Sequence, residues 1–284
     1  MFKKFLGILF FLLMLTPFCV AGNKNMVQIK GSDTMVNLVQ AWAEKFMAEN
    51  PKYFVAVTGG GSGTGISSLI SGSCDIAMSS RPVKPKEMVL AEKRGERPTE
   101  IKVALDGLAV VVNPKNPVSK LTLDQIADIF SGKITNWKQV GGKAGNIVIL
   151  SREVNSGTHV YFKEHVLRKG NPKAKVEFSS KALMLCSSQA IADEITQNQS
   201  AIGYYGMGYI SKKQKAIAIA KDAKSVYEKP LIVNVISNKY PISRPLFLYT
   251  SQKPAGIVKA FINFALSKEG QKIVLMTDFV PIKK

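Results

Sequence analysis

Three short clusters of small polar residues hold the side chains best suited to bind an anion. They are Gly-Ser-Asp-Thr at 31–34, Gly-Gly-Gly-Ser-Gly-Thr-Gly at 59–65 and Ser-Arg-Glu-Val-Asn-Ser-Gly-Thr at 151–158. At least two of them open an apparent helix, where exposed backbone N–H groups, hydroxyls and a nearby arginine together suit a tetrahedral oxyanion. Because the clusters lie far apart in the chain, they predict one anion held from several directions.

The cluster at 151–158 carries the strongest signal. Ser151 and Arg152 leave a predicted strand, and residues 155–158 begin a predicted helix. Arg152 can donate a charge-assisted pair of hydrogen bonds, while Ser156, Thr158 and adjacent amides supply further donors. Simple helix capping is the alternative. We expect this arginine to face an open cleft and to contribute little to the core.

Two further loops are candidates for the same site. Residues 31–34 lie between a strand and an amphipathic helix, so Ser32, Asp33 or Thr34 is expected near the N-cap, and plain capping is the alternative. The loop at 79–82 (Ser-Ser-Arg-Pro) ends a strand, and loops at the carboxyl ends of parallel strands point into a cleft. We expect Arg81 to meet the anion or a carboxylate across the cleft; a surface arginine is the alternative.

The glycine run at 59–65 does not match a nucleotide-binding loop. Gly60 and Gly65 have the separation of a P-loop, but Ile66 and Ser67 stand where Lys and Ser/Thr are required, and no dinucleotide fingerprint fits. Glycines that let the backbone approach an anion, with Ser62 as a donor, fit better than a nucleotide site. A flexible turn is the alternative.

The sequence shows no catalytic or metal-binding constellation. An enzyme acting on phosphate esters would need a nucleophile with a base, or a metal-carboxylate cluster, and neither is visible. His159 and His165 are poorly spaced for a shared zinc site. Cys74 and Cys186 are expected to be separate buried thiols, with a disulfide as the alternative. We therefore expect a binding protein without a cofactor, not an enzyme.

The N-terminus predicts export. Lys3 and Lys4 precede an apolar run at 5–18, and small residues follow at 19–21, so residues 1–21 form a predicted secretory signal peptide. The run is shorter than the roughly 20 residues of a membrane span. A retained anchor and lipidation of Cys19 are the alternatives. We therefore expect a periplasmic or otherwise extracytoplasmic protein.

The chain is strongly basic, and losing Lys3 and Lys4 lowers its formal charge only from +19 to +17, because no acidic residue precedes Gly22. The lysines are scattered, which fits either an unspecialised surface or a field that attracts an anionic ligand. No stripe of basic residues interleaved with aromatic ones is present, so we expect no nucleic-acid partner.

Strand-like and helix-like patterns alternate along the mature chain and predict an α/β fold. The predicted strands are 27–29, 54–57, 75–78, 108–112, 147–150, 201–204 and 246–249. The predicted helices are 35–49, 62–71, 122–130, 156–167, 187–197 and one beginning near 257. We expect two lobes, each a mostly parallel sheet flanked by helices, joined by a hinge. Residues 22–113 with 236–284 would form lobe 1, and residues 114–235 lobe 2.

Taken in order, these clusters resemble the periplasmic phosphate-binding proteins of the phosphate ABC transporter (PstS-type, type II periplasmic-binding-protein family). The motifs are those at 31–34 and 59–65, Asp-Ile-Ala-Met-Ser-Ser-Arg at 75–81, Arg152 with Ser-Gly-Thr at 156–158, and Ala-Ile-Gly-Tyr at 201–204. The resemblance implies a monomer that encloses phosphate in a dry cleft and delivers it to the permease subunits of an ABC transporter. By residue match, it implies ligand contacts from Thr34, the amide of Met35, Ser62, Arg152, Ser156, Gly157 and Thr158. The loop residues Ser32, Asp33, Ser80 and Arg81 complete the predicted site.

Two departures from the family pattern affect selectivity. Family members often carry aspartate where this chain has Ser80, and many have another where it has Val154. Hydrogenphosphate carries a hydrogen-bond donor that sulfate lacks, so a buried acceptor disfavours sulfate. Asp33 is the nearest candidate acceptor, and Glu153 is a poorer one. The alternatives are a binding protein for sulfate, molybdate or tungstate, a phosphate-ester enzyme, and a signalling or adhesion module that keeps the fold.

Overall fold

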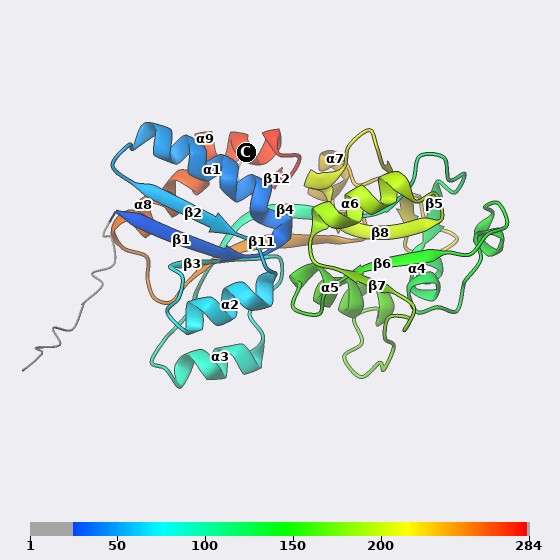
Figure 1. The fold of residues 1–284 in the computed structure, drawn as a ribbon, viewed down its shortest axis with the longest axis horizontal. Helices are drawn as coiled ribbons and strands as arrows, with labels where there is room; N and C mark the ends of the chain where they lie inside the picture. Colours follow the sequence, from blue (N-terminus) through cyan, green and yellow to red (C-terminus); the bar gives the residue numbers. More distant parts are fainter. Residues whose placement is uncertain (1–24, 283–284) are drawn as a thin grey trace, which may run out of the picture.

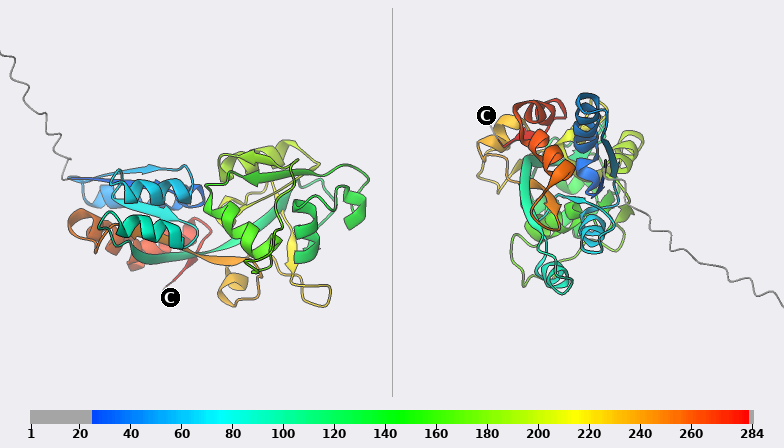
Figure 2. Two further views of the ribbon diagram at one scale, coloured as in Figure 1. Left: turned by 90° about the horizontal axis from the view of Figure 1, so that it is seen from below. Right: turned by 90° about the vertical axis from the view of Figure 1, so that its left-hand side faces the viewer.

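The computed structural model describes residues 25–282, which form two halves lying side by side (Figures 1 and 2). The predicted signal peptide at 1–21, with Cys19, lies outside the described residues. One mixed ten-stranded sheet runs through both halves in the order β2-β1-β3-β11-β4-β8-β6-β7, and β9 and β12 also pair with β4. The predicted two-lobed α/β class is confirmed.

The first half, which contains β1, β2 and β3, has a parallel three-stranded centre. Its strands are β1 (Met26–Gly31), β2 (Phe54–Thr58), β3 (Ile76–Ser79) and β12 (Val280–Pro281). Its helices are η1 (Asp33–Met35), α1 (Val36–Glu49), α2 (Ser62–Ile70), α3 (Pro85–Glu92), α8 (Gly256–Leu266) and α9 (Lys268–Met276).

The second half, which contains β6, β7 and β8, is also built on parallel strands. Its strands are β5 (Lys120–Thr122), β6 (Val148–Arg152), β7 (Leu183–Leu185), β8 (Ala201–Gly206), β9 (Lys215–Ala216) and β10 (Ala218–Ala220). Its helices are α4 (Leu123–Phe130), η2 (Trp137–Val140), α5 (Gly157–Phe162), η3 (Lys163–Leu167), α6 (Ser188–Gln197), η4 (Met207–Tyr209) and α7 (Ile232–Ile236).

Two long strands, β4 (Thr99–Val112) and β11 (Ser243–Thr250), run between the halves (Figure 1). Through Gly107, β4 pairs with β11, and from Leu108 to Val112 it pairs with β8. This change of partner lies before the predicted lobe boundary at Asn113. The lobe division itself stays a prediction.

Local sequence explains most of the elements. Apolar residues at helical spacing give α1 a buried face that includes Trp42 and Phe46, and Asn50 ends the helix before Pro51. The indole of Trp42 donates to the Gly270 carbonyl at 2.8 Å and thereby ties α1 to α9. The predicted single helix at 156–167 is instead α5 followed by a wider π-helical turn, η3.

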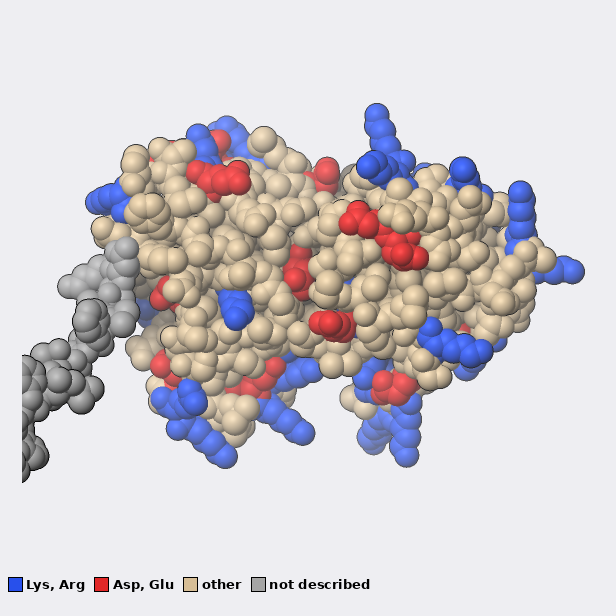
Figure 3. Space-filling model, viewed as in Figure 1, with Lys and Arg blue, Asp and Glu red and all other residues tan. Residues whose placement is uncertain are grey.

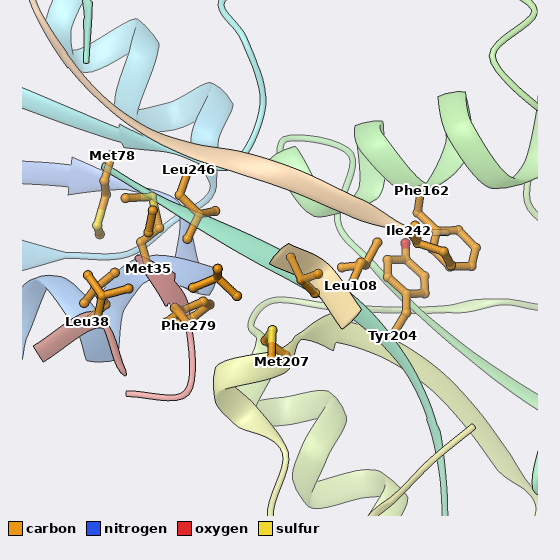
Figure 4. Packing of buried hydrophobic residues seen from close by; sticks show 14 of the residues in the cluster. Met35, Leu38, Met78, Leu108, Phe162, Tyr204, Met207, Ile242, Leu246 and Phe279 are labelled. Carbon is orange, nitrogen blue, oxygen red and sulfur yellow. The ribbon is translucent and has the colours of Figure 1, made fainter. Parts of the chain in front are cut away.

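One of the hydrophobic clusters continues from one half into the other. In Figure 4, Leu108 and Met207 lie between a group near Met35 and Phe279 and a group that contains Tyr204. All five side chains are buried. The halves are therefore packed against each other as well as joined by strands.

The two cysteines in the described part of the chain are both free. Cys74 is buried, and this burial raises the pKa of its thiol to about 12. Cys186 is exposed, so the prediction of two buried thiols is wrong for this residue.

On the face shown in Figure 3, the Lys and Arg side chains project mainly from the outer parts of both halves. Acidic side chains lie near the line where the halves meet on that face. The positive charge is thus spread over the surface, as the scattered lysines predict. Among residues 25–282, no helix is long and apolar enough to cross a membrane.

Gly65 lies where α2 packs closely against β1, so a substitution there tests this contact. A Cβ at this position would lie 2.4 Å from the Lys30 carbonyl oxygen and 2.6 Å from the Gly31 Cα. Because both neighbours are backbone atoms, Gly65→Ala is expected to destabilise the fold by about 1–3 kcal/mol. Chemical denaturation measures this loss.

Gly145→Ala is the matched control, because no atom lies within 4 Å of its added Cβ. Equal stability of the two variants would show that α2 can move away from β1 at no cost.

Candidate functional site

Loops from both halves converge on one buried group of hydroxyls. Ser32 follows β1, Ser80 follows β3, and Ser62 is the first residue of α2. The Ser32 hydroxyl donates to Ser80 Oγ at 3.0 Å, and Ser62 Oγ lies 3.3 Å from Ser80 Oγ and accepts from the Ser80 amide at 3.0 Å. The three serines are 0–2% exposed and form one connected cluster.

The second half closes over this cluster through α5. Thr34 Oγ1 and Thr158 Oγ1, one from each half, are hydrogen-bonded at 2.8 Å. A Cβ on Gly157 would lie 2.3 Å from Ser62 Oγ and 2.7 Å from Ser80 Oγ, so only glycine allows this approach. The structure thus brings together the predicted residues Ser32, Thr34, Ser62, Ser80, Gly157 and Thr158.

Helix capping accounts for only part of the polar clusters. No side-chain cap is made at Ser32, which precedes η1, so the capping alternative fails there. Ser156 does cap α5, and its hydroxyl accepts from the amides of Thr158 and His159. The predicted amide donor of Met35 is already bonded to the Ser32 carbonyl at 2.9 Å.

Arg152 is buried and held by protein groups, with 1% of its side chain exposed. Nε donates to the Leu185 carbonyl (3.3 Å) and Nη1 to Ser188 Oγ (3.1 Å). Nη2 donates to Asp33 Oδ2 (2.6 Å) and to the Cys186 carbonyl (2.9 Å). A guanidinium has five N–H donors, and these contacts use four of them, which leaves one N–H of Nη1 for a ligand. The expectation of an arginine facing an open cleft is wrong, because β7 and the start of α6 pack around it.

Asp33 neutralises Arg152 from the opposite half. Its Oδ2 accepts from Arg152, and its Oδ1 accepts from the Gly60 amide at 2.9 Å. Val154 is 73% exposed. Glu153 is exposed as well. Asp33 therefore supplies the partner carboxylate for Arg152. These bonds use part of the capacity of Asp33 to accept a hydrogen bond from the ligand.

Arg81 is paired within its own half. Its two terminal nitrogens donate to the two carboxylate oxygens of Glu87 at 2.8 and 2.7 Å. Burial acts to raise the pKa of Glu87, but hydrogen bonds from Arg81 and the Lys84 amide lower it overall. Glu87 lies in α3, so the prediction of a carboxylate across the cleft is wrong. In the described structure, Arg81 Nε is buried and has no hydrogen-bond partner.

Sequence reasoning missed a third arginine, Arg244, and its partner Asp106. Arg244 is 2% exposed and donates to Asp106 Oδ2 from Nε (3.0 Å) and Nη2 (2.9 Å). It also contacts Thr34 and Thr158, two predicted ligand residues. One signal could have revealed it: Ser-Arg-Pro occurs at 243–245 as well as at 80–82.

The charges of the site cancel in pairs. Arg152, Arg81 and Arg244 are each bonded to a carboxylate, from Asp33, Glu87 and Asp106 respectively. His159 adds no charge near neutral pH, because burial lowers its pKa to about 4. What the arrangement offers is a set of directed N–H and O–H donors around hydroxyls, which suits a tetrahedral oxyanion.

One surface hollow lies away from these residues. It has a volume of about 600 Å³ and lies beside α9, and its lining includes Ile236, Leu266, Leu275 and Pro281. Its mostly apolar lining does not suit a small oxyanion. Within residues 25–282, no group of His, Cys, Asp and Glu side chains could hold a metal ion.

Comparison with known proteins identifies the relatives of this chain. The family model described as a PBP superfamily domain matches residues 19–269. The phosphate-binding protein PstS of Bacillus subtilis is 34% identical over 255 residues, which cover 89% of this chain and 80% of the relative. PstS of Pseudomonas aeruginosa PAO1 is 31% identical over 281 residues, covering 93% of this chain and 84% of the relative.

Solved structures of phosphate-binding proteins are also similar to this chain. A putative phosphate ABC transporter substrate-binding protein from Clostridium perfringens, solved with bound phosphate, has a TM-score of 0.81 and 33% identity. The match covers 91% of this chain and all of that one. An ABC-type phosphate transport receptor from Vibrio cholerae has a TM-score of 0.69 and 32% identity, over 89% of this chain and 99% of that one. With these matches spanning most of its length, the chain belongs to the PBP superfamily and, within it, to the family of the PstS phosphate-binding proteins.

Proposed function

We propose that this protein is an exported phosphate-binding protein that delivers inorganic phosphate to the permease of an ABC transporter. The observation that carries the proposal is the convergence of hydroxyls and paired arginines from both halves in one buried cluster. The PstS relatives and the C. perfringens structure named with bound phosphate support it. The protein has no catalytic role in this proposal and acts as a monomer.

The proposed phosphate contacts come from both halves. Ser32, Asp33, Thr34, Met35, Ser62, Ser80 and Arg81 belong to the first half, and Arg152, Ser156, Gly157 and Thr158 to the second. All except Asp33 are buried. An anion at their meeting point would be removed from water. Hydrogen bonds to it are stronger in the protein interior than in water.

Sulfate is the second candidate ligand, because Asp33 is engaged with Arg152 and with the Gly60 amide. A carboxylate has about four lone-pair sites, so two bonds leave capacity to accept the proton of hydrogenphosphate. Whether Asp33 uses that capacity decides between the two anions.

The mature protein, beginning at Gly22, is expected to bind phosphate and to reject sulfate. In Asp33→Asn, the acceptor is weakened and Arg152 loses its counter-charge, so sulfate gains relative to phosphate. Isothermal calorimetry with each anion measures both affinities. The ratio of phosphate to sulfate affinity should fall in the variant.

Two results would contradict this account in different ways. If the parent protein binds sulfate and not phosphate, the proposal that phosphate is the ligand is wrong. If the ratio of phosphate to sulfate affinity is unchanged in Asp33→Asn, phosphate remains the proposed ligand and Asp33 does not explain the selectivity.

Phosphate is expected to hold the two lobes closed. We propose that residues 22–113 with 236–284 and residues 114–235 move as these lobes. The contacts Thr34–Thr158, Asp33–Arg152 and Asn155–Gly60 cross between the halves and break when the halves separate. Small-angle scattering should therefore give a smaller radius of gyration with phosphate than without it.

Asn155→Ala tests whether closure depends on these crossing bonds, since its side chain donates to the Gly60 carbonyl at 2.9 Å and to Thr64 Oγ1 at 3.2 Å. Phosphate is expected to reduce the radius of gyration of this variant less than that of the parent protein. A radius that phosphate never changes, in either protein, argues for a fixed shape.

Arg152→Ala is expected to weaken phosphate binding about tenfold to a hundredfold, the usual cost of one hydrogen bond between charged groups. Because Arg152 is buried and partners Asp33, this variant should also melt earlier without ligand. Arg152→Lys should recover only part of the affinity, since an ammonium cannot present parallel donors. Calorimetry and thermal melts measure both effects.

Arg168→Ala is the control, because this arginine bonds Glu177 and the Val176 carbonyl away from the site. Normal phosphate binding by Arg152→Ala, alongside loss of binding by Arg81→Ala, would place the main cation in the first half instead.

A further inference from the structure

Arg244 occupies a position that no other arginine of the site shares. It is the second residue of β11 and lies directly opposite Asp106 on β4, and these two strands run between the halves (Figure 1). Both side chains are buried, with 2% and 0% exposed. The pair therefore belongs to the connection between the halves.

Asp106 fixes the orientation of the guanidinium. Its Oδ2 accepts from Nε and Nη2 of Arg244, and its Oδ1 accepts from the Met207 amide at 3.0 Å. The Cζ atom of Arg244 lies over the Tyr161 ring, 5.5 Å from the ring centroid. These contacts leave one edge of Arg244 directed at the hydroxyl cluster.

That edge contacts both halves at once. Nη1 donates to the Ser80 carbonyl at 3.2 Å. Nη2 donates to Thr158 Oγ1 at 3.0 Å and lies 3.4 Å from Thr34 Oγ1. Arg244 thus binds the two threonines that meet each other from opposite halves.

The direction of these bonds fixes where the threonine protons go. An arginine can only donate, and Nη2 has two N–H protons, one directed at Asp106 and one shared between the two threonine oxygens, so both oxygens act as acceptors toward it. The two hydroxyls are also bonded to each other at 2.8 Å, and one of them must donate in that bond. One threonine proton remains, and it is free to point at a ligand.

We propose that Arg244, held by Asp106, is a specificity-determining residue that makes the threonine pair a donor toward the bound anion. The inference rests on the proposed function. It acts through Thr34 and Thr158, so Arg244 is a positioning residue. The ligand class it selects is a tetrahedral oxyanion rich in acceptors, which for phosphate is the dianion. Arg244 occupies a lone pair on the threonine oxygens, and without it that lone pair is free to accept the proton of the monoanion.

The test compares the parent with the double variant Arg244→Gln/Asp106→Asn, which replaces the ion pair by a neutral pair and leaves no unpaired buried charge. Phosphate affinity is measured by calorimetry in mildly alkaline and mildly acidic buffer. The parent should weaken on acidification, as the dianion is depleted. The double variant should bind about tenfold or more weakly in alkaline buffer and show a much flatter pH profile.

The tyrosines around the pair do not produce this difference. Tyr161, Tyr204 and Tyr240 are in the electrostatic surroundings of the pair, and burial raises the pKa of each above its usual value, so they stay neutral in both buffers. His159 is present in both proteins, so its titration cancels in the comparison.

Arg244→Lys is the conservative variant and should recover part of the affinity and the steep pH profile. It carries the test if the double variant fails to fold. Arg168→Gln removes a cation outside the site and should match the parent in both buffers.

A folded double variant with the affinity and pH profile of the parent overturns the inference, even if it melts earlier, because Arg244 would then be only structural. Parent protein that binds no phosphate contradicts the proposed function instead. The same series with sulfate then decides the inference: an acceptor-only anion should bind more weakly to the double variant, and equal binding overturns it.

Discussion

The need to neutralise each buried arginine constrains this site more than any other interaction. A buried guanidinium without a partner costs several kcal/mol, so Arg81, Arg152 and Arg244 each require a carboxylate nearby. The carboxylates come from different places: Glu87 from the same half, Asp33 from the opposite half, and Asp106 from the neighbouring strand. The pairing therefore fixes how β1, β4, β6 and β11 lie around the hydroxyl cluster.

Close backbone approach then brings the hydroxyls together. Gly157 lets α5 touch Ser62 and Ser80, and Gly65 lets α2 lie on β1. Neither contact would survive a side chain at the glycine. The donors that remain are short hydroxyls and amides on helix ends and loops, and these point inward because the parallel strands of each half end at the same edge.

The sequence predicted what is local and missed what depends on pairing between distant segments. The clusters at 31–34, 59–65 and 151–158 were recognisable because their residue types and their places before helices are local properties. The partners of Arg152 were not, because Asp33, Leu185 and Ser188 reach it only in the folded chain. Arg244 lies just before the predicted strand at 246–249 and outside the three polar clusters, so nothing local marked it. The first part of β4 was missed because its exposed and buried residues mix, whereas residues 108–112 form a continuous apolar run.

The continuous core around Leu108 and Met207 has a consequence for how the molecule comes apart. Multidomain proteins often unfold in steps, because each domain keeps its own core. Here apolar side chains of both halves share one cluster, and β4 contributes to the sheet on either side of it. Damage to one half therefore exposes apolar surface of the other. The two halves should lose structure as one cooperative unit, with no stable half-folded species for proteases to attack.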